Sequence, residues 1–364
     1  MEKDEEKEVI KTVVSMSRYL MLMTVIALFC IFLFVILTFN QSALTNSPVN
    51  VAVSTSTNIP PIKQESAGSP PRPAPTDAWK APDIRTIPAG KDGDMIRYGK
   101  ELIVSTAKYL GPQGSVAHLT NGMNCQNCHL DAGTKLFSNN FAGFIASYPK
   151  FSGRSGKTEP ASERIAECFE RSLNGKVPDT GKKEIQAIIA YMKWIGKGVK
   201  KGDQVFGSST EKLTFLDQPA DPAKGKVVFI MKCQSCHGEH GEGILATDKK
   251  SYTNPPLWGA NSYNDGAGMY RLINFAGFVK NNMPFGSTYQ SPQLTDEEAW
   301  NVAAFVNSQP RPHKHPGKDY PDASKKPIDL PFGPFADQFT AEQHKYGPFG
   351  PIQQLHQTKT TKKT

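Results

Sequence analysis

Cysteine is scarce in this chain of 364 residues, which contains only six. Methionine and histidine are absent from residues 130–182, and lysine and arginine are absent from residues 19–62. The first absence excludes the commonest soft metal ligands from a long stretch of the chain, and the second leaves the other stretch without positive charge. The six cysteines are therefore the residues from which the function is best predicted.

Four of the six cysteines lie in two CxxCH motifs, Cys125–His129 and Cys233–His237. This spacing is the attachment signature of c-type haem, in which both cysteines form thioethers and the histidine binds the iron. The alternative is a zinc or redox CxxC pair that happens to precede a histidine, and the repetition of the motif argues against it. We therefore predict two covalently bound haem c groups. The predicted attachment residues are Cys125, Cys128, Cys233 and Cys236, and the predicted axial ligands are His129 and His237.

Each motif is preceded by a short helical stretch and followed by a longer one. Apolar residues recur at helical spacing in residues 183–195 and 299–306, and Thr295–Glu298 has the pattern of a capping box. Gly99 and Gly225 would let each first helix pack closely on an aromatic residue of the closing helix. The candidate aromatic residues are Tyr191 or Trp194 in the first unit and Trp300 or Phe305 in the second.

This layout is typical of class I cytochrome c domains, so the predicted fold is all-α with two such domains in tandem. We place domain one at residues 89–205 and domain two at residues 206–310. Residues 40–88 are rich in Ser, Thr and Pro and predict a disordered tether, and residues 311–364 predict a Pro-rich C-terminal tail.

Residues 19–39 form an uncharged, mostly apolar run that is long enough to cross a bilayer as a helix. A signal peptide is the alternative, but its apolar region is usually shorter, and the nearest cleavage site, Gln41–Ala43, fits poorly. Basic residues precede the run and none follows before Lys63. The positive-inside rule then predicts a cytoplasmic tail at residues 1–18, a single pass through the inner membrane, and haem domains on the periplasmic side.

Cys168 is the only soft ligand between His129 and the closing helix of domain one. It is four residues from both Arg164 and Ser172, so the three side chains share one stripe of a helix. A guanidinium group one turn from the sulfur favours the thiolate. We predict that Cys168 is the distal iron ligand of haem one, although most free cysteines are simply small buried hydrophobic residues.

Domain two contains two candidate methionine ligands. Met283 lies in a loop shortly before the closing helix and is the predicted distal ligand of haem two, whereas Met269 lies near a helix start and fits a packing role better. His240 is only three residues beyond His237 and is too constrained to reach the opposite face of the same haem.

Together, these residues resemble the thiosulfate dehydrogenase family, dihaem cytochromes c that form tetrathionate. The resemblance covers residues 96–309, and its most specific part is Glu163–Gly175 around Cys168, with further similarity at residues 141–144, 261–269 and 282–284. It implies that Cys168 ligates the active-site haem and that the second haem takes its ligand from the Met283 loop. Some members use a lysine there, but Lys280 is not assigned this role. The basic and polar residues implied at the first haem are Arg154, Arg164 and Ser172, with Lys176 a weaker match.

The resemblance implies oxidative coupling of thiosulfate to tetrathionate, the reverse reduction, or both. The electron partner would be external, such as a small cytochrome c or a membrane redox complex. The net charge of +8 suits anionic ligands, and we expect no nucleic acid partner. Two alternatives stay open, which are a membrane-tethered electron carrier without its own substrate and a dihaem peroxidase.

Overall fold

The computed structural model describes residues 21, 23–24, 72–314 and 319–361. The chain divides into two units, Met1–Gln64 and Glu65–Thr364, and the fold described below belongs to the second. The predicted transmembrane helix requires correction, because no helix in the described ranges is both long enough and apolar enough to cross a membrane. Apart from residues 21, 23 and 24, the predicted span at residues 19–39 lies outside the described residues.

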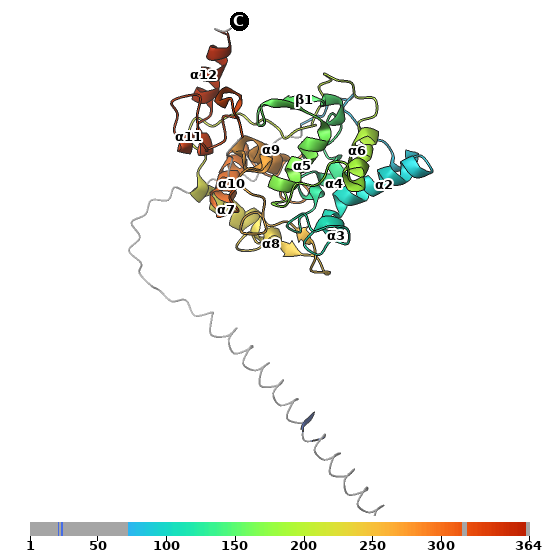
Figure 1. Cartoon of the computed structure of the whole chain (residues 1–364). Coiled ribbons are helices and arrows are strands. Elements are labelled where there is room, and N and C mark those ends of the chain that lie inside the picture. The colour runs from blue at the N-terminus through green and yellow to red at the C-terminus, as the bar shows by residue number, and fades with distance from the viewer. Residues whose placement is uncertain (1–20, 22, 25–71, 315–318, 362–364) are drawn as a thin grey trace, which may run out of the picture. The chain divides into compact units, whose positions relative to one another are not determined.

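Domain one is built from helices and one small hairpin (Figure 1). Its α-helices are α2 (Lys91–Val104), α3 (Thr106–Leu110), α4 (Leu130–Gly133), α5 (Ala161–Arg171) and α6 (Lys183–Ile195). Its short 3-10 turns are η1 (Ile84–Thr86), η2 (Cys125–Asn127) and η3 (Ile145–Ser147). The antiparallel strands β1 (Lys150–Ser152) and β2 (Lys157–Glu159) pair Phe151 with Thr158.

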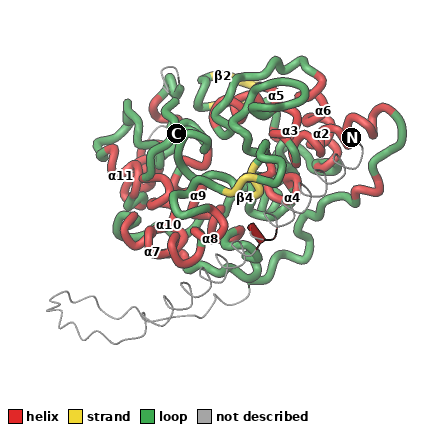
Figure 2. Tube along the Cα trace, turned by 90° about the horizontal axis from the view of Figure 1, so that it is seen from below, coloured by secondary structure: helices red, strands yellow, loops and turns green. Residues whose placement is uncertain are grey.

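Domain two repeats the order of helix, motif, hairpin and closing helix. Its helices are α7 (Pro222–Lys232), α8 (Gln234–His237), η4 (Gly268–Tyr270), α9 (Leu272–Asn282) and α10 (Asp296–Ser308). The strands β3 (Ile244–Leu245) and β4 (Tyr252–Asn254) pair antiparallel. The predicted helical class is therefore correct for the main elements, and the two short hairpins are additions. Figures 1 and 2 show the helices of the two domains gathered side by side.

The first and closing helices of each domain meet at a glycine. A Cβ atom added at Gly99 would overlap a backbone oxygen of α6, and one added at Gly225 would overlap a backbone oxygen of α10. Of the candidate aromatic residues, Tyr191 and Phe305 lie against these glycines. The predicted close crossing is confirmed in both domains, and so is the capping box at Thr295.

The chain after residue 310 contains helices, although we expected a tail. In the part that the structure describes, this C-terminal segment forms η5 (Ala323–Lys325), α11 (Ala341–Tyr346) and α12 (Gly350–Thr361). The ring of Phe349 lies 5.8 Å from that of Trp300 on α10, and Ile352 is fully buried. The segment therefore extends the apolar core of domain two.

The predicted tether is described only from Arg72 onward. Arg72 donates hydrogen bonds to Glu211 at 2.6 Å and to Asn281 at 2.8 Å, and its guanidinium group lies 4.2 Å from the centre of the Tyr289 ring. Arg72–Pro88 is thus attached to the folded unit through at least one well-contacted side chain. Residues 40–71 lie outside the described residues.

We predict that Gly99→Ala destabilises domain one. Alanine would gain about 1 kcal/mol of helix propensity, but the clash of its methyl group with α6 should cost about 3 kcal/mol. Gly268→Ala is the matched control, because a Cβ there meets nothing within 4 Å. Thermal unfolding of the haem-loaded proteins measures the difference, and equal melting temperatures for the two variants would contradict the packing argument.

Candidate functional site

The first CxxCH motif is fixed to α3 by hydrogen bonds. The N–H of Cys125 donates to Thr106 Oγ1 at 2.9 Å, and the N–H of Ala107 donates to Asn124 Oδ1 at 2.8 Å. The side chain of Asn127 accepts from the N–H of Asn124 at 2.7 Å and closes the turn of η2. These hydrogen bonds between protein groups therefore give the motif a defined position relative to the first helices.

The two motif histidines have the same surroundings. His129 Nδ1 lies 2.6 Å from the Asn139 carbonyl oxygen, and His237 Nδ1 lies 2.9 Å from the Pro255 carbonyl oxygen. A carbonyl accepts only from a protonated nitrogen, so each Nε2 keeps its lone pair for a metal. Burial also lowers the pKa of His129 to about 4, which keeps its imidazole neutral. This arrangement fits the axial ligand of a c-type haem in both domains.

Cys168 lies on α5, half-buried, with Arg164 one turn away. Arg164 Nη1 donates to the Cys168 sulfur at 3.5 Å and pairs with Glu167 at 3.2 Å. The charge of Cys168 is the largest cause of a raised pKa for Arg164. The stripe predicted for these side chains is therefore present, and Arg164 is shared between the sulfur and a carboxylate.

The sulfur of Cys168 and the first motif belong to one site. Burial raises the pKa of Cys125 to about 11 and that of Cys128 to about 12, and the charge of Cys168 adds to both shifts. Conversely, the charge of Arg164 contributes to the lowered pKa of His129. The structure thus brings α5 close to the residues that would hold haem one.

Two further polar residues near this site were not found from the sequence. Burial raises the pKa of Tyr148 to about 12, against an opposing contribution from Arg164. Glu159 is only 3% exposed, and its Oε2 has no hydrogen-bond partner in the described part of the chain. Neither residue lies in a motif, so only the fold reveals them.

Arg154 lies in the turn between β1 and β2 and is largely buried, with 14% of its side chain exposed. Its Nη1 donates to the Gly266 carbonyl at 3.1 Å and to Asp319 at 3.0 Å. Ser172 ends α5 and is half-buried, whereas Lys176 is exposed. The predicted basic residue at 154 is therefore already paired with a carboxylate of the C-terminal segment.

The two candidate methionine ligands, Met269 and Met283, have different surroundings. Met269 is 6% exposed, and its sulfur lies 3.9 Å from the side-chain nitrogen of Asn139, whose carbonyl oxygen holds His129. Met269 thus faces domain one. Met283 begins the loop after α9 and is half-buried, so its role as an iron ligand stays a prediction.

Two other residues of this region have surroundings that do not suit iron ligation. Lys280 is 3% exposed, and its ammonium group donates to the Leu294 carbonyl at 2.7 Å and pairs with Asp296 at 2.7 Å. His240 is exposed. Lys280 therefore connects α9 to the start of α10 through its side chain.

Comparison with known proteins matches a cytochrome c domain to the part of the chain around each CxxCH motif. The family model for the SoxA/TsdA cytochrome c domain matches residues 115–200, and the model for cytochrome c matches residues 222–310. The chain is 37% identical over 242 residues to thiosulfate dehydrogenase of Allochromatium vinosum (strain ATCC 17899), covering 65% of this chain and 86% of that protein. It is 36% identical over 234 residues to thiosulfate dehydrogenase of Stutzerimonas stutzeri (strain A1501), covering 64% and 73%. The chain belongs to the thiosulfate dehydrogenase family.

A solved structure of this family has the same fold. The thiosulfate dehydrogenase TsdBA of Marichromatium purpuratum, in its as-isolated form, superposes with a TM-score of 0.60 at 32% identity. The match covers 65% of this chain and 50% of that chain, so this protein spans half the length of that thiosulfate dehydrogenase. The predicted family is confirmed, and the two matched cytochrome c domains support the predicted pair of covalently bound haem c groups. The relatives are oxidoreductases that act on a sulfur compound, which agrees with the predicted enzyme class.

We predict that Met283→Ala removes the methionine-ligated spectrum of haem two and lowers the potential of that haem, because methionine ligation raises it. Met269→Ala is the control, since it also deletes a thioether from domain two but at a side chain that faces Asn139. Absorbance and redox titration of both variants decide between them. Loss of the methionine signature in Met269→Ala alone would reassign the ligand.

Proposed function

We propose that this protein interconverts thiosulfate and tetrathionate. Two thiosulfate dianions form one S–S bond to give a tetrathionate dianion, and two electrons leave for an external one-electron acceptor. A small cytochrome c or a membrane redox complex suits this role, and the reverse reaction would take electrons from the same class of partner. The observation that carries the proposal is the contact of 3.5 Å between Arg164 and the Cys168 sulfur beside the first motif.

The positive charge of Arg164 has two effects in this proposal. It binds the Cys168 sulfur through the hydrogen bond from Arg164 Nη1 at 3.5 Å. It also offsets the repulsion between two dianions that must approach each other to form the new bond. Arg154 adds charge at the same side of domain one, although Asp319 balances part of it.

The predicted iron ligands of the two domains indicate the direction in which electrons would move between them. His129 and Cys168 would hold the iron of haem one, and His237 and Met283 would hold that of haem two. Bound haem supplies one-electron redox chemistry at each domain. A thiolate ligand lowers a haem potential and a methionine ligand raises it, so these ligand sets favour electron movement from domain one to domain two.

We also propose that the haem domains lie on the extracytoplasmic side. Covalent attachment of c-type haem takes place there.

We expect the wild-type protein to reduce an artificial one-electron acceptor when thiosulfate is added. Cys168→Gly should abolish this activity and remove the thiolate signature of one haem. Both haems should stay attached, because the CxxCH motifs are untouched. Wild-type activity in that variant would contradict the assigned role, and activity with peroxide in place of thiosulfate would favour the dihaem peroxidase.

We expect Arg164→Gln to lower kcat/KM for thiosulfate by at least about tenfold, because a charge-assisted contact is lost. High salt should weaken wild-type turnover by screening the same attraction. Arg97→Gln removes an equal charge from an exposed pair with Asp94 and is the control. If Arg164 only holds Glu167, its variant should instead show a lower melting temperature with near-normal kinetics.

A further inference from the structure

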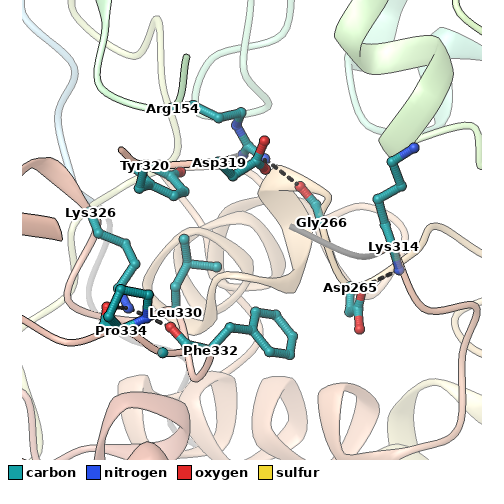
Figure 3. Close-up of a pocket in the computed structure, with 11 residues that line it drawn as sticks. Arg154, Asp265, Gly266, Lys314, Asp319, Tyr320, Lys326, Leu330, Phe332 and Pro334 are labelled. Atoms are coloured by element: carbon teal, nitrogen blue, oxygen red, sulfur yellow. Dashed lines mark hydrogen bonds and ion pairs between the residues drawn. The ribbon is translucent and has the colours of Figure 1, made fainter. Parts of the chain in front are cut away.

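The C-terminal segment reaches the side of domain one that carries Arg154. The carboxylate of Asp319 pairs with Arg154 at 3.0 Å and with Arg171 at 2.8 Å. Figure 3 shows Arg154, Asp319 and Tyr320 near one another in a pocket that is lined mostly by the C-terminal segment. Both family models end at or before residue 310, so this part of the site comes from outside the matched domains.

A ladder of alternating charges fixes this contact. Lys314 pairs with Glu170 at 2.6 Å, Glu170 pairs with Arg171 at 2.7 Å, and Arg171 pairs with Asp319. The last ion pair joins Asp319 to Arg154. Glu170 and Arg171 lie on α5, the helix that carries Cys168. The ladder therefore attaches the C-terminal segment to the helix of the proposed active site.

Tyr320 follows Asp319 and has an uncommon backbone conformation. Its φ angle is +58°, in the left-handed region that large side chains seldom adopt. Its N–H donates to the Arg154 carbonyl oxygen at 2.6 Å, and its ring centre lies 5.5 Å from the Arg154 guanidinium carbon. Such a conformation persists only where the surroundings hold it, as the Asp319 ion pairs and this hydrogen bond do.

The phenol of Tyr320 lies among charged side chains, and Arg154 and Arg164 are two of them. Burial raises the pKa of Tyr320 and the charge of Asp319 adds to the rise, whereas the charges of Arg154, Arg271 and Arg164 oppose it. The charge of Tyr320 is also one of the causes that raise the pKa of Arg164. With its raised pKa the phenol keeps its proton at neutral pH. In the part of the chain that the structure describes, its hydroxyl has no hydrogen-bond partner.

We propose that Tyr320 donates a hydrogen bond to the thiosulfate dianion at the haem-one site, and that Asp319 anchors the segment that presents it. The inference rests on the proposed function and names a further substrate-binding residue for it. A thiosulfate ion carries only acceptor oxygens and sulfur, so a protonated phenol near two guanidinium groups suits it chemically. The C-terminal segment is then a part of the active site.

The test compares Tyr320→Phe with Tyr270→Phe in the full-length, haem-loaded protein. Tyr270 is a matched control, because its ring stacks on Phe332 of the same segment at 5.8 Å and it loses the same hydroxyl. Thiosulfate binding is measured by titration against the haem absorbance, and turnover is measured with an artificial acceptor. We expect Tyr320→Phe to raise both Kd and KM by at least about tenfold with little change in kcat, because a hydrogen bond to a charged group is lost. Tyr270→Phe should match the wild type.

The two readouts separate the inference from the proposed function. If the wild type binds thiosulfate without turning it over, the proposed function fails, and the Kd of Tyr320→Phe still tests the inference. An unchanged Kd in Tyr320→Phe overturns the inference alone. A lower melting temperature with unchanged Kd would show that the hydroxyl is structural, and a wild type that binds no thiosulfate overturns both.

Discussion

The close approach of the first and closing helices at a glycine is the constraint on which the rest of each domain depends. Gly99 and Gly225 allow backbone contact that any side chain would prevent. Because this contact fixes the helix pair, the CxxCH motif that follows the first helix starts from a fixed place. The hydrogen bonds from each motif histidine to a loop carbonyl then set the orientation of the imidazole. This close helix crossing at a glycine occurs in both domains, with Tyr191 beside Gly99 and Phe305 beside Gly225.

Charge organises the site that these domains create. Burying an ion is costly unless a partner is buried with it, and two arginines of α5 have such partners. Arg171 is shared between Glu170 and Asp319, and Arg164 is shared between Glu167 and the Cys168 sulfur. Removing one partner from such a network would leave an uncompensated charge. The C-terminal segment is held to domain one by ion pairs, and to domain two by apolar packing at Trp300 and by the ion pair between Arg271 and Asp329.

Local sequence patterns predicted the features that depend on local spacing. The CxxCH motifs, the helices with periodic apolar residues and the stripe of Arg164 and Cys168 all follow from residues a few positions apart. Contacts between distant parts of the chain were not accessible in this way. Asp319 is 165 residues from Arg154, and composition alone described its surroundings as a Pro-rich tail. Tyr148 and Glu159 were missed for the same reason, since their chemistry arises from burial and not from a motif.

Asn139 contacts His129 in domain one and Met269 in domain two. Its carbonyl oxygen holds the ring of His129, while its side chain touches the sulfur of Met269 in domain two. A single residue therefore contacts both η4 and the imidazole that would bind the first iron. The strength of that imidazole as a ligand follows the length of its hydrogen bond to the carbonyl. A shift of Met269 that moved Asn139 would therefore change the basicity of the His129 imidazole, without any electron passing between the domains.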